Sequence, residues 1–123
     1  PMANGLLTAC YGKDDKFDPK LDYRSAMPQF TPEAAEENRA LLELLRDLAE
    51  RKHATPAQIS LSWMLCKKPY IVPIPGSRKE ERMRENAGAA EVVLSPAEVA
   101  TLDRILETVP MSAVFGGTAV KSR

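Results

Sequence analysis

This 123-residue sequence has no long apolar run, no excess of charge of either sign, and little cysteine. No apolar run approaches the ~20 residues that a membrane helix needs, and no signal-peptide pattern is recognised, so no membrane partner is expected. Seventeen basic residues balance seventeen acidic ones, and a neutral chain has no long-range field to gather nucleic acid. We therefore expect no nucleic-acid partner, and any anion site must be local.

Cysteine is limited to Cys10 and Cys66, which lie far apart without a C-x-x-C spacing. This predicts free thiols in a reducing cytoplasm rather than a disulfide or a metal site, and Cys66 is expected to be buried on a helix. His53 is the single histidine. It comes at a predicted helix end, where it is expected to interact with the helix dipole.

Apolar periodicity and cap residues predict a mostly helical chain. The predicted helices span 33–52, 56–67, 78–87 and 96–107. The first carries an apolar stripe formed by Leu41, Leu42, Leu45, Leu48 and Ala49. Each of the other three opens with a capping box, made by Thr55 and Gln58, by Ser77 and Glu80, and by Ser95 and Glu98. On the last helix, Val99, Leu102 and Leu106 are expected to face inward.

Three of the segments outside these helices carry a prediction of their own. Residues 9–32 show no period and are predicted to be an irregular loop, and residues 108–123 a C-terminal tail. The apolar run YIVPIP at 70–75 predicts one clear strand, buried on both faces. A lone strand cannot satisfy its own edges, so the chain is expected to be part of something larger. The alternatives are self-association, or a compact helical fold with an extended linker at 70–76.

The stretch IVPIPGSRKEERMREN predicts a local anion site. A strand that enters a helix through a glycine turn presents unpaired N–H groups to an anion. Gly76 permits close approach of the backbone, and arginine matches phosphate geometry. An adenosine phosphate would meet Gly76, Ser77, Arg78, Arg82, Glu85 and Asn86. The alternative is a capped helix start whose charges form solvated pairs.

The same residues resemble the aldo-keto reductase family. "IPIPGSRKEERMREN" is similar to the cofactor signature of that family, "PMANGLLT" to its loop after the preceding strand, and "TPAQISLSWMLCKKPYIVPIPG" to its run from helix to strand. The family fold is an α/β class (β/α)₈ TIM barrel of about 250 residues. The resemblance therefore implies that 1–123 is the C-terminal part of a single barrel domain.

The resemblance implies an NADPH-dependent reductase of small-molecule carbonyl compounds. The family's catalytic tyrosine, lysine, aspartate and histidine belong to the first half of the barrel, so no catalytic residue is assigned and the chain alone is expected to be inactive. Ser77 and Arg78 would bind the 2′-phosphate of NADP(H), with Gly76 giving backbone access. Arg82 would lie on the adenine. Glu85 and Asn86 would bind its edge, and Met2 and Asn4 would face the pyrophosphate or ribose.

Two departures from the family pattern fall in the first loop: Met2 replaces a leucine, and Ala9-Cys10 replaces a glycine. One alternative function is a non-catalytic adenine-nucleotide-binding or assembly module. Another is a helix-turn-helix DNA binder built on 33–66. That class needs a basic recognition face, and 56–66 has no lysine or arginine.

Overall fold

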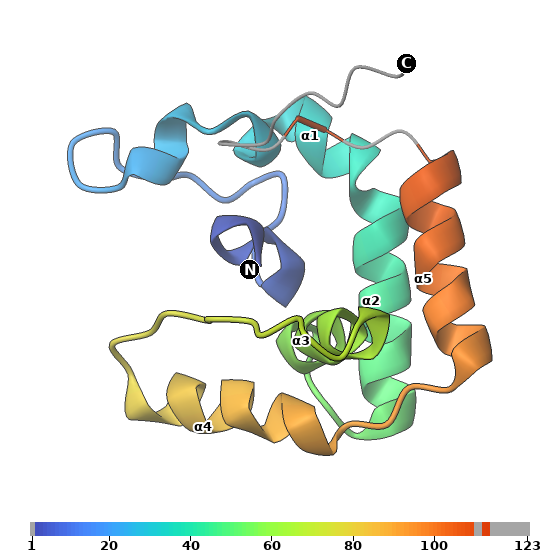
Figure 1. Cartoon of the computed structure of the whole chain (residues 1–123). Helices are drawn as coiled ribbons and strands as arrows, with labels where there is room; N and C mark the ends of the chain where they lie inside the picture. Colours follow the sequence, from blue (N-terminus) through green and yellow to red (C-terminus); the bar gives the residue numbers. More distant parts are fainter. Residues whose placement is uncertain (1, 110–111, 114–123) are drawn as a thin grey trace.

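The computed structural model describes residues 2–109 and 112–113, which form helices joined by irregular segments (Figure 1). The α-helices are α1 (Pro32–Glu37), α2 (Arg39–Lys52), α3 (Pro56–Lys67), α4 (Glu80–Gly88) and α5 (Pro96–Thr108). The 3₁₀ helices are η1 (Ala3–Thr8), η2 (Tyr23–Ala26), η3 (Pro28–Phe30) and η4 (Ala89–Glu91). The prediction of a mostly helical chain is confirmed.

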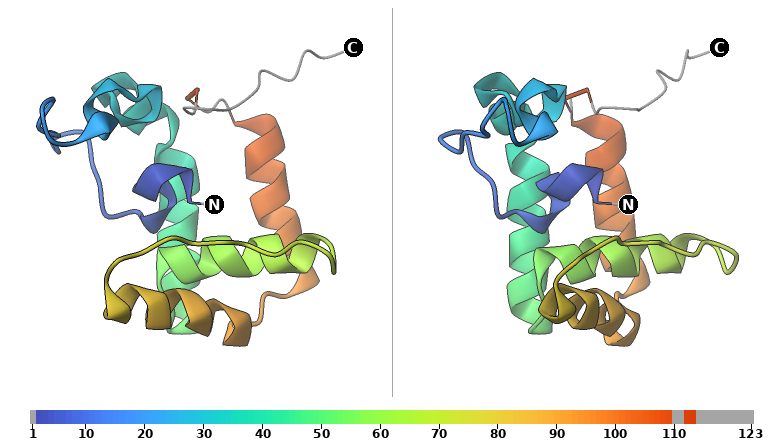
Figure 2. Two further views of the ribbon diagram at one scale, coloured as in Figure 1. Left: turned by 60° about the vertical axis from the view of Figure 1, so that its left-hand side comes forward. Right: turned by 90° about the vertical axis from the view of Figure 1, so that its left-hand side faces the viewer.

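The core lies where α2, α3, α5 and η1 meet. Helices α2 and α5 run side by side, and α3 with α4 crosses them at one end (Figures 1 and 2). The predicted stripe of α2 is buried throughout, and Leu48 is 1% exposed. It packs with Leu6 of η1, Ile59 of α3 and Leu102 of α5. Burial of these side chains, at ~1.5–3 kcal/mol each, holds the helices together.

The helix predicted at 33–52 is divided at Asn38. The Thr31 hydroxyl caps α1 by accepting from the N–H of Ala34 at 3.1 Å. Asn38 is 2% exposed. Its Nδ2 donates to the Ser112 Oγ at 2.7 Å, and its Oδ1 accepts from the Ser112 N–H at 3.1 Å. A buried amide must be satisfied, and here the partner lies beyond α5, so the break coincides with a long-range tie.

Helix α3 has the predicted range and the predicted capping box, with Thr55 and Gln58 bonded reciprocally. Ile59 and Leu61 are 0% and 2% exposed. The burial does not extend to its last turn. Leu65 is 41% exposed, and the prediction that Cys66 is buried is wrong because its thiol is exposed.

Helix α5 also opens with its predicted capping box, between Ser95 and Glu98. Leu102 is buried as expected, but Leu106 is 42% exposed, and Ile105 packs against the core in its place. Asp103 links α5 to α3. It accepts from the Trp63 Nε1 at 2.8 Å and from the Lys67 Nζ at 2.6 Å.

The strand predicted at 70–75 is absent, and no strand occurs elsewhere in the described part of the chain. Tyr70 lies in a turn and residues 71–75 follow it without a paired strand, and the side chains of Tyr70, Val72 and Ile74 are 77%, 77% and 83% exposed. The expectation of burial on both faces is therefore wrong. An apolar run can form a strand only where a neighbour supplies the ladder, and prolines at 73 and 75 remove two donors from this one.

The 9–32 segment contains η2 and η3 and is otherwise irregular. It is held by ring contacts among Tyr11, Phe17 and Phe30, with centroids 5.0–5.9 Å apart. The predicted tail at 108–123 lies mostly outside the described residues. Among the described residues, no helix is long and apolar enough to cross a bilayer.

Glu98 should make folding sensitive to acid. Its carboxylate accepts from the Lys52 Nζ at 2.9 Å and from the Ser95 N–H at 2.7 Å. The Lys52 bond, followed by the Ser95 bond, lowers the pKa of Glu98 below its ordinary value. A depressed folded-state pKa adds stability above the unfolded value of about 4.3, and that stability disappears as pH falls through the folded value.

We expect Glu98→Gln to lower the free energy of unfolding at neutral pH by about 0.5–2 kcal/mol, the range for a lost cap interaction. The difference from wild type should shrink as pH falls below about 4. Urea denaturation at several pH values measures it. Glu107→Gln, at an exposed position on the same helix, is the control. A difference that stays constant with pH would contradict the assigned role of the carboxylate.

Candidate functional site

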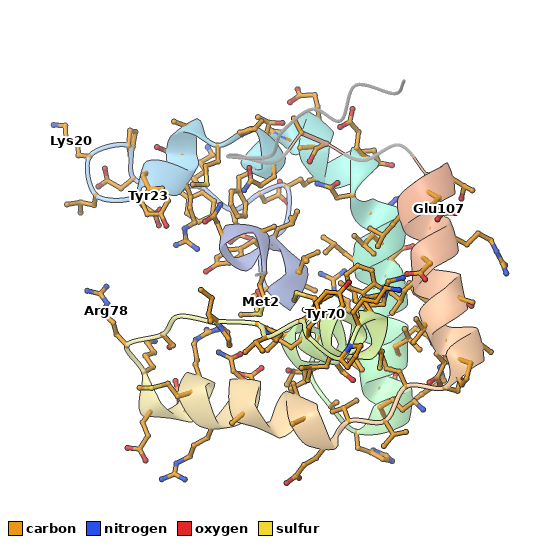
Figure 3. The ribbon with its side chains drawn as sticks, in the orientation of Figure 1. Met2, Lys20, Tyr23, Tyr70, Arg78 and Glu107 are labelled. Atoms are coloured by element: carbon orange, nitrogen blue, oxygen red, sulfur yellow. The ribbon has the colours of Figure 1, made fainter. Side chains whose placement is uncertain are left out.

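One cleft of about 530 Å³ gathers all eight residues that the sequence analysis assigned to a nucleotide site. Its lining includes Met2, Asn4, Gly76, Ser77, Arg78, Arg82, Glu85 and Asn86. They come from η1, from the turn before α4 and from α4 itself. Figure 3 shows Tyr23 above Arg78 at the left of the view, and Met2 further into the molecule.

The turn at 76–79 differs from the prediction. Helix α4 begins at Glu80, with Lys79 as N-cap and no side-chain cap bond. The prediction of a Ser77–Glu80 capping box, and of a helix that begins at 78, is therefore wrong. The Ser77 hydroxyl instead accepts from the Lys79 N–H at 3.1 Å. Such a local bond competes with helix formation. Arg78 is therefore exposed in the turn and outside the first helical turn.

This correction changes how the turn can hold an anion. The first turn of α4 carries Glu80 and Glu81, whose charges oppose an anion at that helix end. Attraction must therefore come from the side chains of Ser77 and Arg78 in the turn and of Arg82 on α4, which all line the cleft. Arg82 is exposed, while Glu85 and Asn86 are half-buried.

Gln58 fixes α4 against α3. Its Oε1 completes the capping box by accepting from the Thr55 N–H at 3.0 Å, and its Nε2 donates to the Glu85 carbonyl at 2.8 Å. The amide passes so close to Gly88 that a Cβ there would lie 2.8 Å from Nε2. One side chain thus positions the α4 residues that line the cleft, and a glycine makes room for it.

The η1 wall has an unusual backbone. Ala3, Asn4 and Gly5 all have positive φ, at 48°, 59° and 102°. Glycine adopts this region without strain, and its missing side chain is also needed for space. A Cβ at Gly5 would lie 3.1 Å from the Tyr11 ring. Met2 and Asn4 are held at the cleft by this turn, with Asn4 exposed.

Sequence reasoning missed the opposite wall, which includes Asp22 and Arg24. The Arg24 Nε donates to Asp22 Oδ1 at 2.9 Å and its Nη1 to the Tyr11 hydroxyl at 2.7 Å. Arg24 lowers the pKa of Asp22, chiefly through the side-chain hydrogen bond, and Asp22 raises the pKa of Arg24. The D-x-R spacing of Asp22 and Arg24 was the only sequence feature that could have indicated this wall, because Tyr11 is remote in sequence and the loop has no apolar period.

A family model and three relatives place this chain in a family. The model of the Aldo/keto reductase family matches residues 1–107. Aldo-keto reductase str7 of Strobilurus tenacellus is 35% identical over 107 residues, which is 87% of this chain and 32% of that protein. Aldo-keto reductase yakc of Schizosaccharomyces pombe, whose name includes NADP(+), is 34% identical over 94% of this chain and 33% of its own length.

Probable aldo-keto reductase 1 of Glycine max is 39% identical over 75% of this chain and 26% of its own length. The chain belongs to the aldo/keto reductase family, a family of oxidoreductases that act on small carbonyl compounds with a nicotinamide cofactor. It spans about a third of the length of the curated relatives that it matches. Among the described residues, no cluster of three or more His, Cys, Asp or Glu side chains could hold a metal.

The Gln58–Gly88 contact predicts that the effect of Gly88→Ala on stability depends on whether the Gln58 side chain is present. Gly88 has φ −61°, so alanine fits the backbone and should gain about 1 kcal/mol of helix propensity. In wild type this gain should be cancelled, because the new Cβ displaces the Gln58 amide. In Gln58→Ala the space is free, and Gly88→Ala should stabilise by about 1 kcal/mol.

A double-mutant cycle by urea denaturation tests this. Loss of the Gln58 side-chain amide signals from their wild-type positions in Gly88→Ala would show the displacement directly by NMR. Equal effects of Gly88→Ala in both backgrounds would mean that the amide and the glycine are not coupled.

Proposed function

We propose that the cleft binds the adenosine-phosphate part of NADP(H), and that this chain forms the C-terminal part of an aldo-keto reductase barrel. The observation that carries the proposal is the convergence of η1, the 76–79 turn and α4 on one cleft of about 530 Å³. Family membership supports a nicotinamide cofactor, and the name of the yeast relative includes NADP(+).

The chemistry of the lining fits such a nucleotide. Arg78 and the Ser77 hydroxyl are donors suited to a 2′-phosphate, and the exposed turn leaves the Arg78 guanidinium accessible. Arg82 can stack on the adenine. Glu85 and Asn86 are half-buried along the same helix and offer an acceptor and an amide to the adenine edge.

In the proposed whole enzyme, NADPH supplies the hydride that converts a small-molecule carbonyl into an alcohol. The residues of this chain bind and orient the adenosine end, and remote binding of this kind positions a reacting group. The proton donor is expected from the first half of the barrel. The alternative is a non-catalytic adenine-nucleotide-binding or assembly module, which would bind the nucleotide without turnover in any context.

Arg78 should determine selectivity for the 2′-phosphate. A charge-assisted bond is worth about 1.5–3 kcal/mol, and each 1.4 kcal/mol is tenfold in affinity. Arg78→Ala should therefore weaken binding of 2′,5′-ADP about ten- to a hundredfold and leave 5′-AMP nearly unchanged. Arg82→Ala should weaken both ligands, because they share the adenine ring. Calorimetric or NMR titration of the chain measures this.

Arg84→Ala is the matched control. Arg84 lies on the same helix, is paired with Glu80 at 2.7 Å and is not among the cleft-lining residues, so both affinities should stay at the wild-type value. Equal losses of 2′,5′-ADP and 5′-AMP on Arg78→Ala would remove its phosphate role. An activity assay separates the enzyme from the non-catalytic alternative. The proposed whole enzyme should reduce an aldehyde with NADPH, and a variant of it that lacks the proton donor should not.

A further inference from the structure

Another cavity, of about 180 Å³, lies where the 9–32 segment meets helices α1 and α2. In Figures 1 and 2 this segment and α1 lie at the end of α2 that is opposite to α4. None of the residues that line the cavity lines the nucleotide cleft, so the two are separate sites. We call this second site the loop cavity.

One part of the lining of the loop cavity is apolar. Leu6 and Leu42 belong to it, and each is 6% exposed. The half-buried rings of Tyr11 and Phe30 also line it and meet edge to face, with centroids 5.9 Å apart. An apolar cavity of about 150 Å³ binds benzene, so the loop cavity has room for one ring-sized apolar group.

The charged part of the lining is mainly positive. It consists of Lys13, Glu36, Arg39 and Arg46. Glu36 is paired with Arg39 at 2.9 Å, while Lys13 and Arg46 have no carboxylate partner in the described part of the chain. Although the chain as a whole is neutral, two cations without a counter-charge therefore attract an anion to this cavity.

Arg46 is held where it can share an anion with Lys13. Its Nη2 donates to the Ala9 carbonyl at 2.9 Å, and this bond fixes the guanidinium against the segment that carries Lys13. A guanidinium has five N–H donors, and the others of Arg46 make no hydrogen bond with any described residue. Its planar fork matches a carboxylate, and anchoring lowers the entropy cost of binding.

We propose that the loop cavity binds a small carboxylate that carries one aromatic ring, such as benzoate. The carboxylate binds to Arg46 and Lys13, and the ring packs against Phe30 and Leu42. The size of the cavity favours this class of ligand, because a ring of the size of benzene occupies most of the space and leaves room for only a compact anionic group. The site is independent of the nucleotide cleft and goes beyond the proposed function.

Ligands that carry one of the two features test the site in the chain itself. On NMR titration, benzoate should shift the backbone signals of Gly12 and Leu42, which line the loop cavity. Benzamide has the ring without the charge, and acetate has the charge without the ring. Each should bind at least about tenfold more weakly than benzoate, because either a charge-assisted bond or the burial of the ring is lost.

Two variants test the cations. Arg46→Gln and Lys13→Gln should each weaken binding of benzoate about tenfold. Arg51→Gln is the matched control and should keep the wild-type affinity, because Arg51 lies on the same helix, pairs with Asp47 at 2.8 Å and does not line the loop cavity. If Arg46→Gln alters the segment through loss of its bond to Ala9, Lys13→Gln and the three ligands on wild type still decide the question.

The inference is overturned by equal affinity for benzoate and acetate, which would mean an open charged surface, or for benzoate and benzamide, which would mean that the cations have no role. Absence of benzoate binding in the millimolar range would also overturn it. Saturating 2′,5′-ADP should leave the affinity for benzoate unchanged. If this nucleotide displaces benzoate, benzoate lies in the nucleotide cleft, and the inference fails while the proposed function stands. A chain that binds benzoate at Gly12 and Leu42 but does not bind 2′,5′-ADP would support the inference and overturn the proposed function.

Discussion

Burial of α3 on two sides is the constraint from which the positions of its neighbours follow. Ile59 faces the core shared with α2, and the polar side chains on the buried faces must find partners. Ser62 donates to the Val92 carbonyl and Gln58 to the Glu85 carbonyl, each at 2.8 Å. A buried polar group left unpaired costs about 1–3 kcal/mol, so these bonds hold α4 and the segment after η4 against α3. The α4 residues that line the cleft are therefore positioned by hydrogen bonds that the buried helix α3 must make.

Proline decides which capping boxes could be predicted. Thr55 and Ser95 are each followed by proline at the first helical position, and both boxes form as expected. Proline fixes φ near the helical value and has no N–H to lose, so the helix start has little alternative. Ser77 is followed by Arg78 and has the same S-x-x-E pattern, yet its hydroxyl bonds locally. Without proline, the pattern does not choose between a box and a short turn.

The limits of sequence reasoning lie where a feature depends on a distant partner. Most helices follow from periodicity. The break at Asn38 coincides with its bonds to Ser112, and a strand at 70–75 would need a neighbouring strand, of which the described part of the chain has none. Met2 and Asn4, on the η1 wall of the cleft, were predicted from the family resemblance. The wall of Arg24 depends on Tyr11, thirteen positions away, and no local pattern in the sequence records that contact.

The unpaired segment 71–75 presents different hydrogen-bonding groups on its two edges. Along an extended chain, successive residues direct their N–H and C=O groups to opposite edges. Prolines 73 and 75 have no N–H, and the Ile71 N–H already donates to the Lys68 carbonyl at 3.1 Å across the turn at 69–70, so the edge of residues 71, 73 and 75 can only accept. The edge of Val72 and Ile74 keeps its N–H donors. Of the two edges, only this second one has the donors and acceptors that a complete ladder with a neighbouring strand needs.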